Sequence, residues 1–302
     1  MRLPLPNSKS FPFPERLVCF RLKPSNCFHQ ASLSSTSLEV LHLRPKNKEK
    51  RGSEKRIRSI TKMEVNMKHA AVEKCAVVTG ANKGIGLETV NNAGASGVIV
   101  DEQGLKALNI DPASWLSGKA TNLVQAVIKQ TYEKAEECLN TNYYGCKRVT
   151  EALLPLLKLS TLGARIINVS SLRGELKRIP SEKIRNELGD MESLMEDKLD
   201  AILEKFLHDL KANALQANGW SVMLPSYSIS KATLNAYTRV LAKKYPEMCI
   251  NCVHPGYVDT DINWHTGTMT VEEGARGSVK LALLPDGGPT GCYFDRTEVA
   301  DF

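Results

Sequence analysis

The sequence predicts an α/β fold with a doubly wound parallel sheet, and three observations support this prediction. An apolar run over 75–78 leads directly into a glycine-rich turn, and two further apolar runs over 165–171 and 247–255 have the composition of buried strands. Helical periodicity occupies 133–157 and 228–244, before each of the two later runs. Strands that alternate with helices pair in parallel, and such sheets bind ligands at the carboxyl ends of their strands.

Charge is distributed very unevenly along the chain. The 302 residues carry a formal net charge of +7, but residues 1–62 hold 14 Lys or Arg against 4 Asp or Glu, so residues 63–302 are slightly acidic. The globular part therefore offers no general surface for a polyanion, and we expect no nucleic-acid partner. With 42% apolar residues the chain can bury a sizeable core.

Residues 1–62 are rich in Pro, Ser and basic residues and lack a sustained helical or strand period, so we expect a disordered basic extension. Three interpretations of this extension stay open: a plastid or mitochondrial transit peptide, a nucleic-acid-binding arm over 44–62, or an inert or spurious segment. The last is suggested by Met63, which stands just before the globular pattern. We expect one globular domain over 63–302, located in the cytoplasm unless the extension directs it to the plastid.

Neither a disulfide framework nor a metal site is predicted. The eight cysteines are scattered, and the one close pair, Cys249 and Cys252, lies in an apolar run without a second pair or a His cluster at ligand spacing. Reduced core cysteines are the simpler interpretation. No apolar stretch of about 18 residues occurs, so we expect no membrane-spanning helix.

The turn over 79–86 has the glycine content of a phosphate-binding loop. Gly80, Gly84 and Gly86 allow strained dihedral angles and let a pyrophosphate approach the backbone, next to the positive end of a helix dipole. The spacing G-x-x-x-G-x-G differs from G-x-G-x-x-G, and alone it is weak evidence. Lys83 adds a cation that is either solvated or placed for a 2′-phosphate.

Tyr227 and Lys231 are four residues apart on a predicted helix, which places both side chains on one face. A pair at this spacing is common by chance, and alone it indicates only an exposed helix face. Here the pair belongs to a longer series of motifs. In chain order the others are Asn91-Asn92-Ala93-Gly94, Asn142, Ser171, Pro255-Gly256 and Thr260.

This series resembles the short-chain dehydrogenase/reductase family, most closely its branch of carbonyl, salutaridine and menthone/neomenthol reductases. The resemblance covers 74–302 apart from one gap and implies a Rossmann-type sheet. It also implies NADPH-dependent reduction of a ketone or aldehyde on a small apolar, terpenoid- or alkaloid-like molecule.

The resemblance assigns catalytic roles to four residues. Tyr227 is the general acid, Lys231 stabilises the developing phenolate and holds the ribose, Ser171 polarises the substrate carbonyl, and Asn142 anchors a water in the proton relay. A free tyrosine has a pKa of about 10, so a neighbouring cation is needed to stabilise phenolate as the proton leaves.

The resemblance also implies the residues that contact NADPH, with Lys83 selecting the 2′-phosphate. The full set is Gly80, Asn82, Lys83, Gly84, Ile85, Gly86, Asn92, Ala93, Gly94, Tyr227, Lys231, Pro255, Gly256, Val258 and Thr260. His254 and His265 lie near the last of these, but a lone His there is more often a hydrogen-bonded loop residue than a catalyst.

The 55 residues between Ser171 and Tyr227 exceed what a strand-to-helix connection needs, so we expect a helical insertion over 172–225. An apolar stripe predicts one packed helix that ends before Asn218-Gly219. In the resembling branch this insertion covers the face used for tetramers, which implies a monomer. The stripe is Leu199, Ile202, Leu203, Phe206, Leu207 and Leu210, and the proposed pocket walls are Trp220, Met223 and Leu224.

The junction between Glu88 and Asn91 departs from the family. Each βαβ unit takes roughly 30 residues, so about 60 or more, with three interior strands, are missing here. The stabilising free energy lost with these strands should exceed a domain's typical net stability of about 5–15 kcal/mol. The alternative to an active, truncated reductase is therefore an inactive isoform or gene-model product that does not bind the cofactor.

Overall fold

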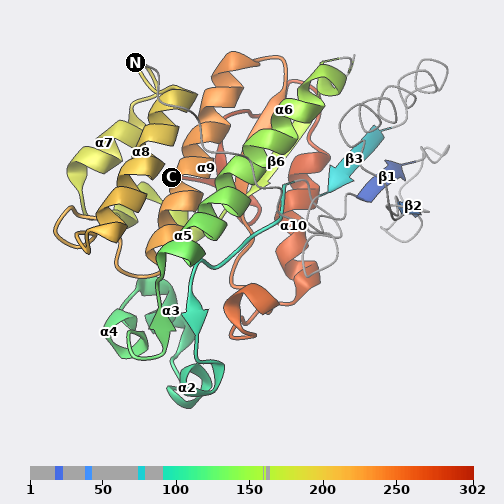
Figure 1. Cartoon of the computed structure of the whole chain (residues 1–302). Coiled ribbons are helices and arrows are strands. Elements are labelled where there is room, and N and C mark those ends of the chain that lie inside the picture. The colour runs from blue at the N-terminus through green and yellow to red at the C-terminus, as the bar shows by residue number, and fades with distance from the viewer. Residues whose placement is uncertain (1–17, 23–37, 43–73, 79–90, 159, 161–163) are drawn as a thin grey trace, which may run out of the picture.

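The computed structural model describes residues 18–22, 38–42, 74–78, 91–158, 160 and 164–302 (Figure 1). In this part of the chain the two predicted apolar runs form parallel neighbours in one sheet, with strand order β6-β7-β8-β9. β8 continues the parallel arrangement and β9 returns antiparallel. The strands are β6 (Arg165–Val169), β7 (Cys249–His254), β8 (Tyr293–Asp295) and β9 (Glu298–Ala300).

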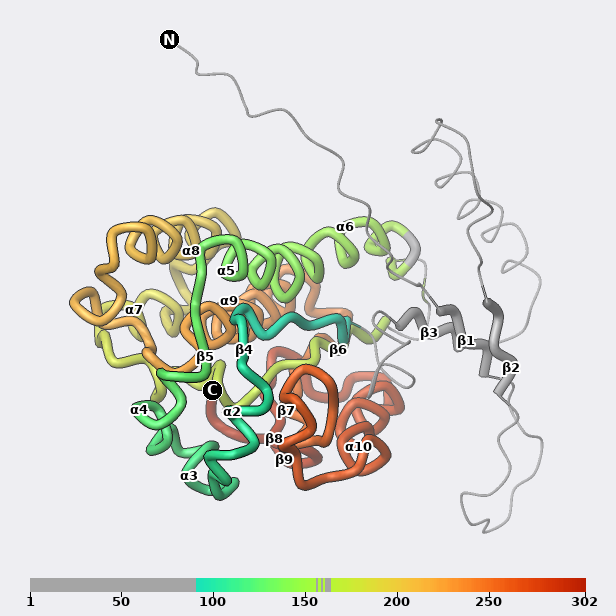
Figure 2. The backbone as a smooth tube through the Cα atoms, turned by 60° about the horizontal axis from the view of Figure 1, so that its bottom comes forward, coloured from blue at the N-terminus to red at the C-terminus, as the bar shows by residue number. Residues whose placement is uncertain are grey.

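Helices cover both faces of this sheet, as a doubly wound arrangement requires (Figures 1 and 2). The side chains of β6 alternate between the two layers: Ile166 packs into the core beneath α9, whereas Ile167 packs with Leu281 of α10. The predicted α/β fold is confirmed. The helices are α5 (Tyr132–Leu139), α6 (Cys146–Leu157), α9 (Pro225–Lys244) and α10 (Val271–Ala282).

Helix α9 begins at Pro225, three residues before its predicted start at Ser228. Pro225 occupies its first turn, where the missing N–H of a proline costs nothing, and Leu224 before it adopts a left-handed φ of 50°. Tyr227 therefore belongs to the helix and does not precede it. A π-helical segment, η2 (Asn140–Gly145), joins α5 to α6 within the run predicted to be helical over 133–157.

The insertion contains two helices that pack against α9. The predicted stripe is confirmed, because Leu199, Leu203 and Phe206 are fully buried. Helix α8 ends at Lys211, before the stop signal at Asn218-Gly219, and Asn213 already has a left-handed φ of 54°. The elements are η3 (Leu172–Gly174), η4 (Leu176–Arg178), α7 (Glu182–Gly189) and α8 (Glu196–Lys211).

A small lobe that no motif predicted follows the Asn-Asn-Ala-Gly segment. Its core is formed by Leu105, Trp115 and Val124, and Met223 from the insertion packs into it. Its elements are β4 (Ile99–Val100), α2 (Glu102–Ala107), α3 (Pro112–Ser117), α4 (Thr121–Val124) and β5 (Ile128–Lys129).

The first predicted strand forms, but it does not pair as expected. β3 (Lys74–Val78) is antiparallel to β1 (Val18–Leu22), which also pairs with β2 (Leu38–His42), in a separate sheet of order β2-β1-β3. Two short strands, β1 and β2, thus lie in the extension where we expected none, and the backbone of β1 pairs with that of β3. In the described part of the chain, no helix is long and apolar enough to cross a membrane.

Candidate active site

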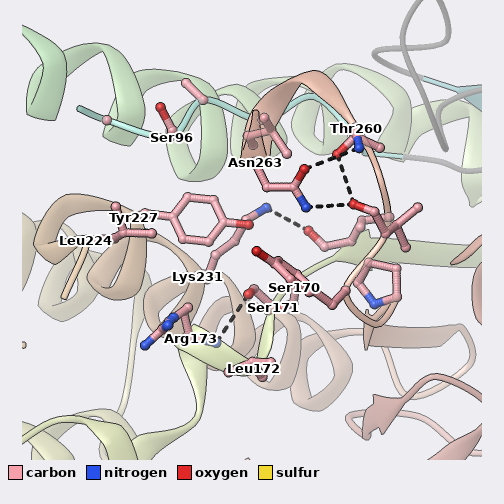
Figure 3. Close-up of a pocket in the computed structure, with 18 of the residues that line it drawn as sticks. Ser96, Ser170, Ser171, Leu172, Arg173, Leu224, Tyr227, Lys231, Thr260 and Asn263 are labelled. Carbon is pink, nitrogen blue, oxygen red and sulfur yellow. Dashed lines mark hydrogen bonds between the residues drawn. The ribbon is translucent and has the colours of Figure 1, made fainter. Parts of the chain in front are cut away.

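A cavity of about 630 Å³ opens at the carboxyl ends of β6 and β7, where the fold class predicted a ligand (Figure 3). Segments far apart in the sequence line it together: 92–98, 169–173, 254–258 and 260–264. Tyr227, Lys231 and Leu224 enter from α9, and Trp115, Leu116, Lys134, Glu137 and Thr141 complete the wall.

The two serines after β6 have different partners. Ser170 donates to the Asn235 side chain and is held against α9, whereas Ser171 caps η3 by accepting from the Arg173 N–H at 3.2 Å. The Ser171 hydroxyl also lies close enough to Tyr227 to lower the pKa of the phenol. The sequence chose Ser171 over Ser170, and the structure brings Ser171 to the tyrosine.

Tyr227 and Lys231 point into the same cavity from one face of α9 (Figure 3). Burial raises the pKa of Tyr227 to about 12, and the Ser171 hydroxyl and the Arg173 charge lower it in part. The ammonium of Lys231 lies 5.7 Å from the centroid of the Tyr227 ring and donates to the Val169 carbonyl at 2.8 Å. Burial lowers the pKa of Lys231.

Asn142 lies behind the cavity wall, fully buried in the π-helical segment. Its Oδ1 accepts from the Ala95 N–H at 2.8 Å, and its Nδ2 lies 3.0 Å from the Ala95 carbonyl and 2.9 Å from Ser230 Oγ. The side chain thus fastens the segment after Gly94 to the helices. The predicted water relay through Asn142 stays a prediction.

The Asn-Asn-Ala-Gly segment runs beside the end of β6. The Val169 N–H donates to the Asn91 carbonyl at 3.3 Å, and Asn91 Nδ2 donates to Asn168 Oδ1 at 2.9 Å. Gly94 faces the loop after β7 closely, since a Cβ there would lie 3.1 Å from the Ile262 side chain. The predicted contact residues Asn92, Ala93 and Gly94 all line the cavity.

The loop after β7 supplies the opposite wall. Gly256 has a φ of 97°, and a Cβ there would lie 2.4 Å from Met269 Sδ, so the turn requires glycine. Thr260 and Asn263 form a capping box around η5 (Asp261–Asn263), and Asn263 Nδ2 donates to the Val258 carbonyl at 2.7 Å. The predicted residues Pro255, Gly256, Val258 and Thr260 line the cavity.

The predicted phosphate-binding residues lie outside the described residues: Gly80, Asn82, Lys83, Gly84, Ile85 and Gly86. The junction after Glu88 lies at the edge of the same undescribed range. Of the three proposed pocket walls, Leu224 lines the cavity and Met223 packs beside it in the lobe. The prediction for Trp220 is wrong, because its indole is buried in the main core and donates to Asp209 at 2.8 Å.

One residue of the site escaped the sequence argument, and another was interpreted wrongly. Arg173 is 7% exposed and lines the cavity, and its only sequence signal was a basic residue two positions after Ser171. His254 is the last residue of β7, and its Nδ1 is buried without a hydrogen-bond partner in the described structure. The hydrogen-bonded loop interpretation is thus wrong for His254, whereas His265 fits it, with Nδ1 2.7 Å from Asp259.

No cluster of His, Cys, Asp or Glu among the described residues could hold a metal ion. The cysteines of the parallel-sheet body are reduced: Cys138, Cys146, Cys249, Cys252 and Cys292. The Cys249–Cys252 pair is buried in β7.

No family model matches the sequence, but individual relatives do. "Short-chain dehydrogenase/reductase 1" of Saponaria officinalis is 54% identical over 213 residues, which are 70% of this chain and 68% of that protein. Salutaridine reductase of Papaver bracteatum is 45% identical over 218 residues, with 70% of each chain covered.

Solved structures agree with these relatives. The salutaridine reductase of Papaver somniferum matches with a TM-score of 0.61 at 44% identity, over 68% of this chain and 72% of that one. The menthone neomenthol reductase of Mentha piperita matches with a TM-score of 0.58 at 38% identity, over 70% and 71%. Close to a third of each neighbour has no counterpart in these alignments, in keeping with a shortened Rossmann fold. The chain belongs to the short-chain dehydrogenase/reductase family, and its relatives are reductases.

Proposed function

We propose that this chain reduces a ketone or aldehyde on a small apolar molecule to an alcohol, with NADPH as the hydride donor. One observation carries the proposal: Ser171, Tyr227 and Lys231 line one cavity at the carboxyl ends of β6 and β7. A hydroxyl, a phenol and an ammonium around one cavity match what protonation of a carbonyl oxygen requires.

The described end of the cofactor site fits a nicotinamide nucleotide. Lys231 has three N–H donors and uses one on the Val169 carbonyl, so donors remain for ribose hydroxyls. Gly94 and Gly256 place no side chain on the two walls at their own positions, and His254 also lines the cavity. When bound, NADPH supplies the hydride. A mouse relative, 35% identical over 161 residues, is named "Carbonyl reductase [NADPH] 3".

Tyr227 would hold the proton that the carbonyl oxygen receives. With its pKa raised to about 12, the phenol stays protonated at neutral pH until the substrate oxygen gains negative charge. The Ser171 hydroxyl would donate to the same oxygen, and the buried Lys231 ammonium would compensate the phenolate that forms. The chain's own residues thus complete a proton transfer.

Apolar walls around the phenol favour an apolar substrate. Trp115, Leu116, Leu224, Tyr257 and Trp264 belong to one hydrophobic cluster and line the cavity together. Their arrangement suits a fused-ring or terpenoid-like body held by packing. Relatives named for such substrates, salutaridine reductase and (+)-neomenthol dehydrogenase, support this substrate class.

A second candidate is an inactive chain without cofactor affinity, and one observation favours it. β3, the strand that leads toward the glycine-rich turn, pairs with β1 and not with the parallel sheet. In a Rossmann-type site the phosphate-binding turn follows a strand of the parallel sheet, and β3 is not one of the described strands of that sheet.

The test combines a fluorescence titration of the purified chain with NADPH and a screen of carbonyl substrates. Saturable binding and turnover that Tyr227→Phe abolishes support the reductase. Tyr237→Phe is the matched control: Tyr237 lies on the same helix, away from the cavity, and its buried hydroxyl has no hydrogen-bond partner in the described structure. A chain that melts cooperatively but does not bind NADPH would instead support the second candidate, the inactive chain.

A further inference from the structure

Arg173 places a guanidinium in the wall of the substrate cavity (Figure 3). It is the second residue of η3, and its NH2 group donates to the backbone carbonyl of Trp115 in the lobe. The side chain is only 7% exposed, and its charge acts on both Tyr227 and Tyr257. The guanidinium therefore lies between the proposed proton donor and the apolar wall.

The charge of Arg173 has no carboxylate partner among the described residues. Glu175, two positions further, is bound by Lys177 and Arg178, each at 3.1 Å. Burial and the repulsion from Arg178 lower the pKa of Arg173 to about 10, and only the phenols of Tyr227 and Tyr257, with no carboxylate, act in the opposite direction. Buried charges in proteins are normally paired, so an unpaired one in a cavity wall points to an anionic ligand.

The hydrogen-bonding capacity of Arg173 is also largely unused. A guanidinium has five N–H donors, and this one makes a single side-chain hydrogen bond in the described structure, to Trp115. None of its nitrogens is both buried and unpartnered, so those that lack a protein acceptor keep some exposed surface, and the residue lines the cavity. Guanidinium groups bind carboxylates through two parallel hydrogen bonds.

We propose that Arg173 binds a carboxylate of the substrate, so that the substrate is an apolar molecule carrying both the carbonyl to be reduced and a carboxylate. The identity of the reacting carbonyl rests on the proposed function, whereas carboxylate binding does not. Trp115, Leu224 and Tyr257 would enclose the apolar body between the two polar groups.

A purely structural role makes a different prediction, and Arg178 tests it. Arg178 donates to the carbonyl of Leu116 at 2.8 Å, next to the carbonyl that Arg173 contacts, but it does not line the cavity. If these arginines only hold the backbone of the lobe, replacing either one should have the same effect on ligand binding.

The probes are 3-benzoylpropionate and its methyl ester, whose binding to the full chain is measured by calorimetry without cofactor. We expect wild-type chain to bind the acid roughly 10- to 100-fold more tightly than the ester, the range of a charged hydrogen bond. Arg173→Gln should abolish this preference, Arg173→Lys should keep part of it, and Arg178→Gln should keep it all.

Equal binding of acid and ester by the wild-type chain would overturn the proposal without any variant. So would a preference that survives in Arg173→Gln, or one that Arg178→Gln removes equally. A parallel NADPH titration addresses the cofactor: loss of NADPH affinity in Arg173→Gln would assign the guanidinium to a cofactor phosphate. An acid preference in a chain that reduces no ketone would refute the proposed function and leave carboxylate binding by Arg173 intact.

Discussion

The ammonium of Lys231 donates a hydrogen bond to the backbone carbonyl of Val169 at 2.8 Å, and so joins α9 to the last residue of β6. The same two residues line the cavity on either side of Ser171. This buried donor thus helps to hold the helix that carries Tyr227 against the end of β6, together with the hydrogen bond between Ser170 and Asn235.

Lys231→Met should lower kcat/KM for a neutral ketone by about 10²-fold or more, because the cation next to Tyr227 and the ribose donors disappear together. Steady-state kinetics with a parallel NADPH titration would check this. The control is Lys243→Met, at an exposed ion pair near the end of the same helix. Unchanged kinetics in Lys231→Met would contradict the role of the ammonium.

Asn142→Ala should destabilise the fold by roughly 2–4 kcal/mol, since the Ala95 N–H and carbonyl lose their partner in a buried site. Urea unfolding measures this, and Asn263→Ala, in the more exposed loop, should cost less. A variant of normal stability whose turnover falls would instead favour the water relay that the family resemblance implies.

His254 should make the protein less stable in acid. Burial lowers its pKa from 6.5 to about 4, so between these values the unfolded chain binds a proton that the folded chain does not. The free energy of unfolding should therefore fall as pH drops from 6.5 toward 4, by on the order of 3 kcal/mol.

Thermal melts across this pH range would measure the effect. His254→Asn should flatten the dependence, whereas the exposed His265→Asn should leave it in place. A wild-type melting temperature that rises as pH falls through this window would contradict the assignment.

Phe206→Ala should cost about 3–5 kcal/mol of stability, the usual range for a fully buried aromatic ring. The ring packs edge-to-face on Trp220 at 5.3 Å between centroids, so α8 would lose this ring contact with the segment that follows it. Denaturant unfolding gives the value, and Met195→Ala, at an exposed position, should fall within the experimental error.

We also expect a monomer. α8 buries its stripe of Leu199, Leu203 and Phe206 in the core beneath it, which leaves the covered face of α5 and α9 unavailable to a second copy. Light scattering after size-exclusion chromatography should give a mass near 33.3 kDa. A dimer mass at micromolar concentration would refute this expectation.

The sequence predicted the site better where function depends on local spacing. Tyr227 and Lys231 share a helix face, and Ser171 ends a strand, so each position followed from periodicity and one family pattern. Arg173 was missed because its significance depends on the absence of a carboxylate nearby, which only the tertiary structure reveals. The prediction that β3 joins the parallel sheet was also wrong. Its partner β1 lies 50 residues or more away in the chain, and pairing over such a distance has no signature in the local sequence.

The placement of Tyr227 and Lys231 on a single 20-residue helix has a mechanical consequence. Displacement of α9 as a unit moves the proton donor and the ammonium together, so their separation is insensitive to breathing of the fold. The walls at Gly94 and Thr260 belong to other segments, so a shift of either wall would leave the separation of that pair unchanged. The geometry of proton transfer is thereby set by one helix, independently of the segments that form the rest of the cavity.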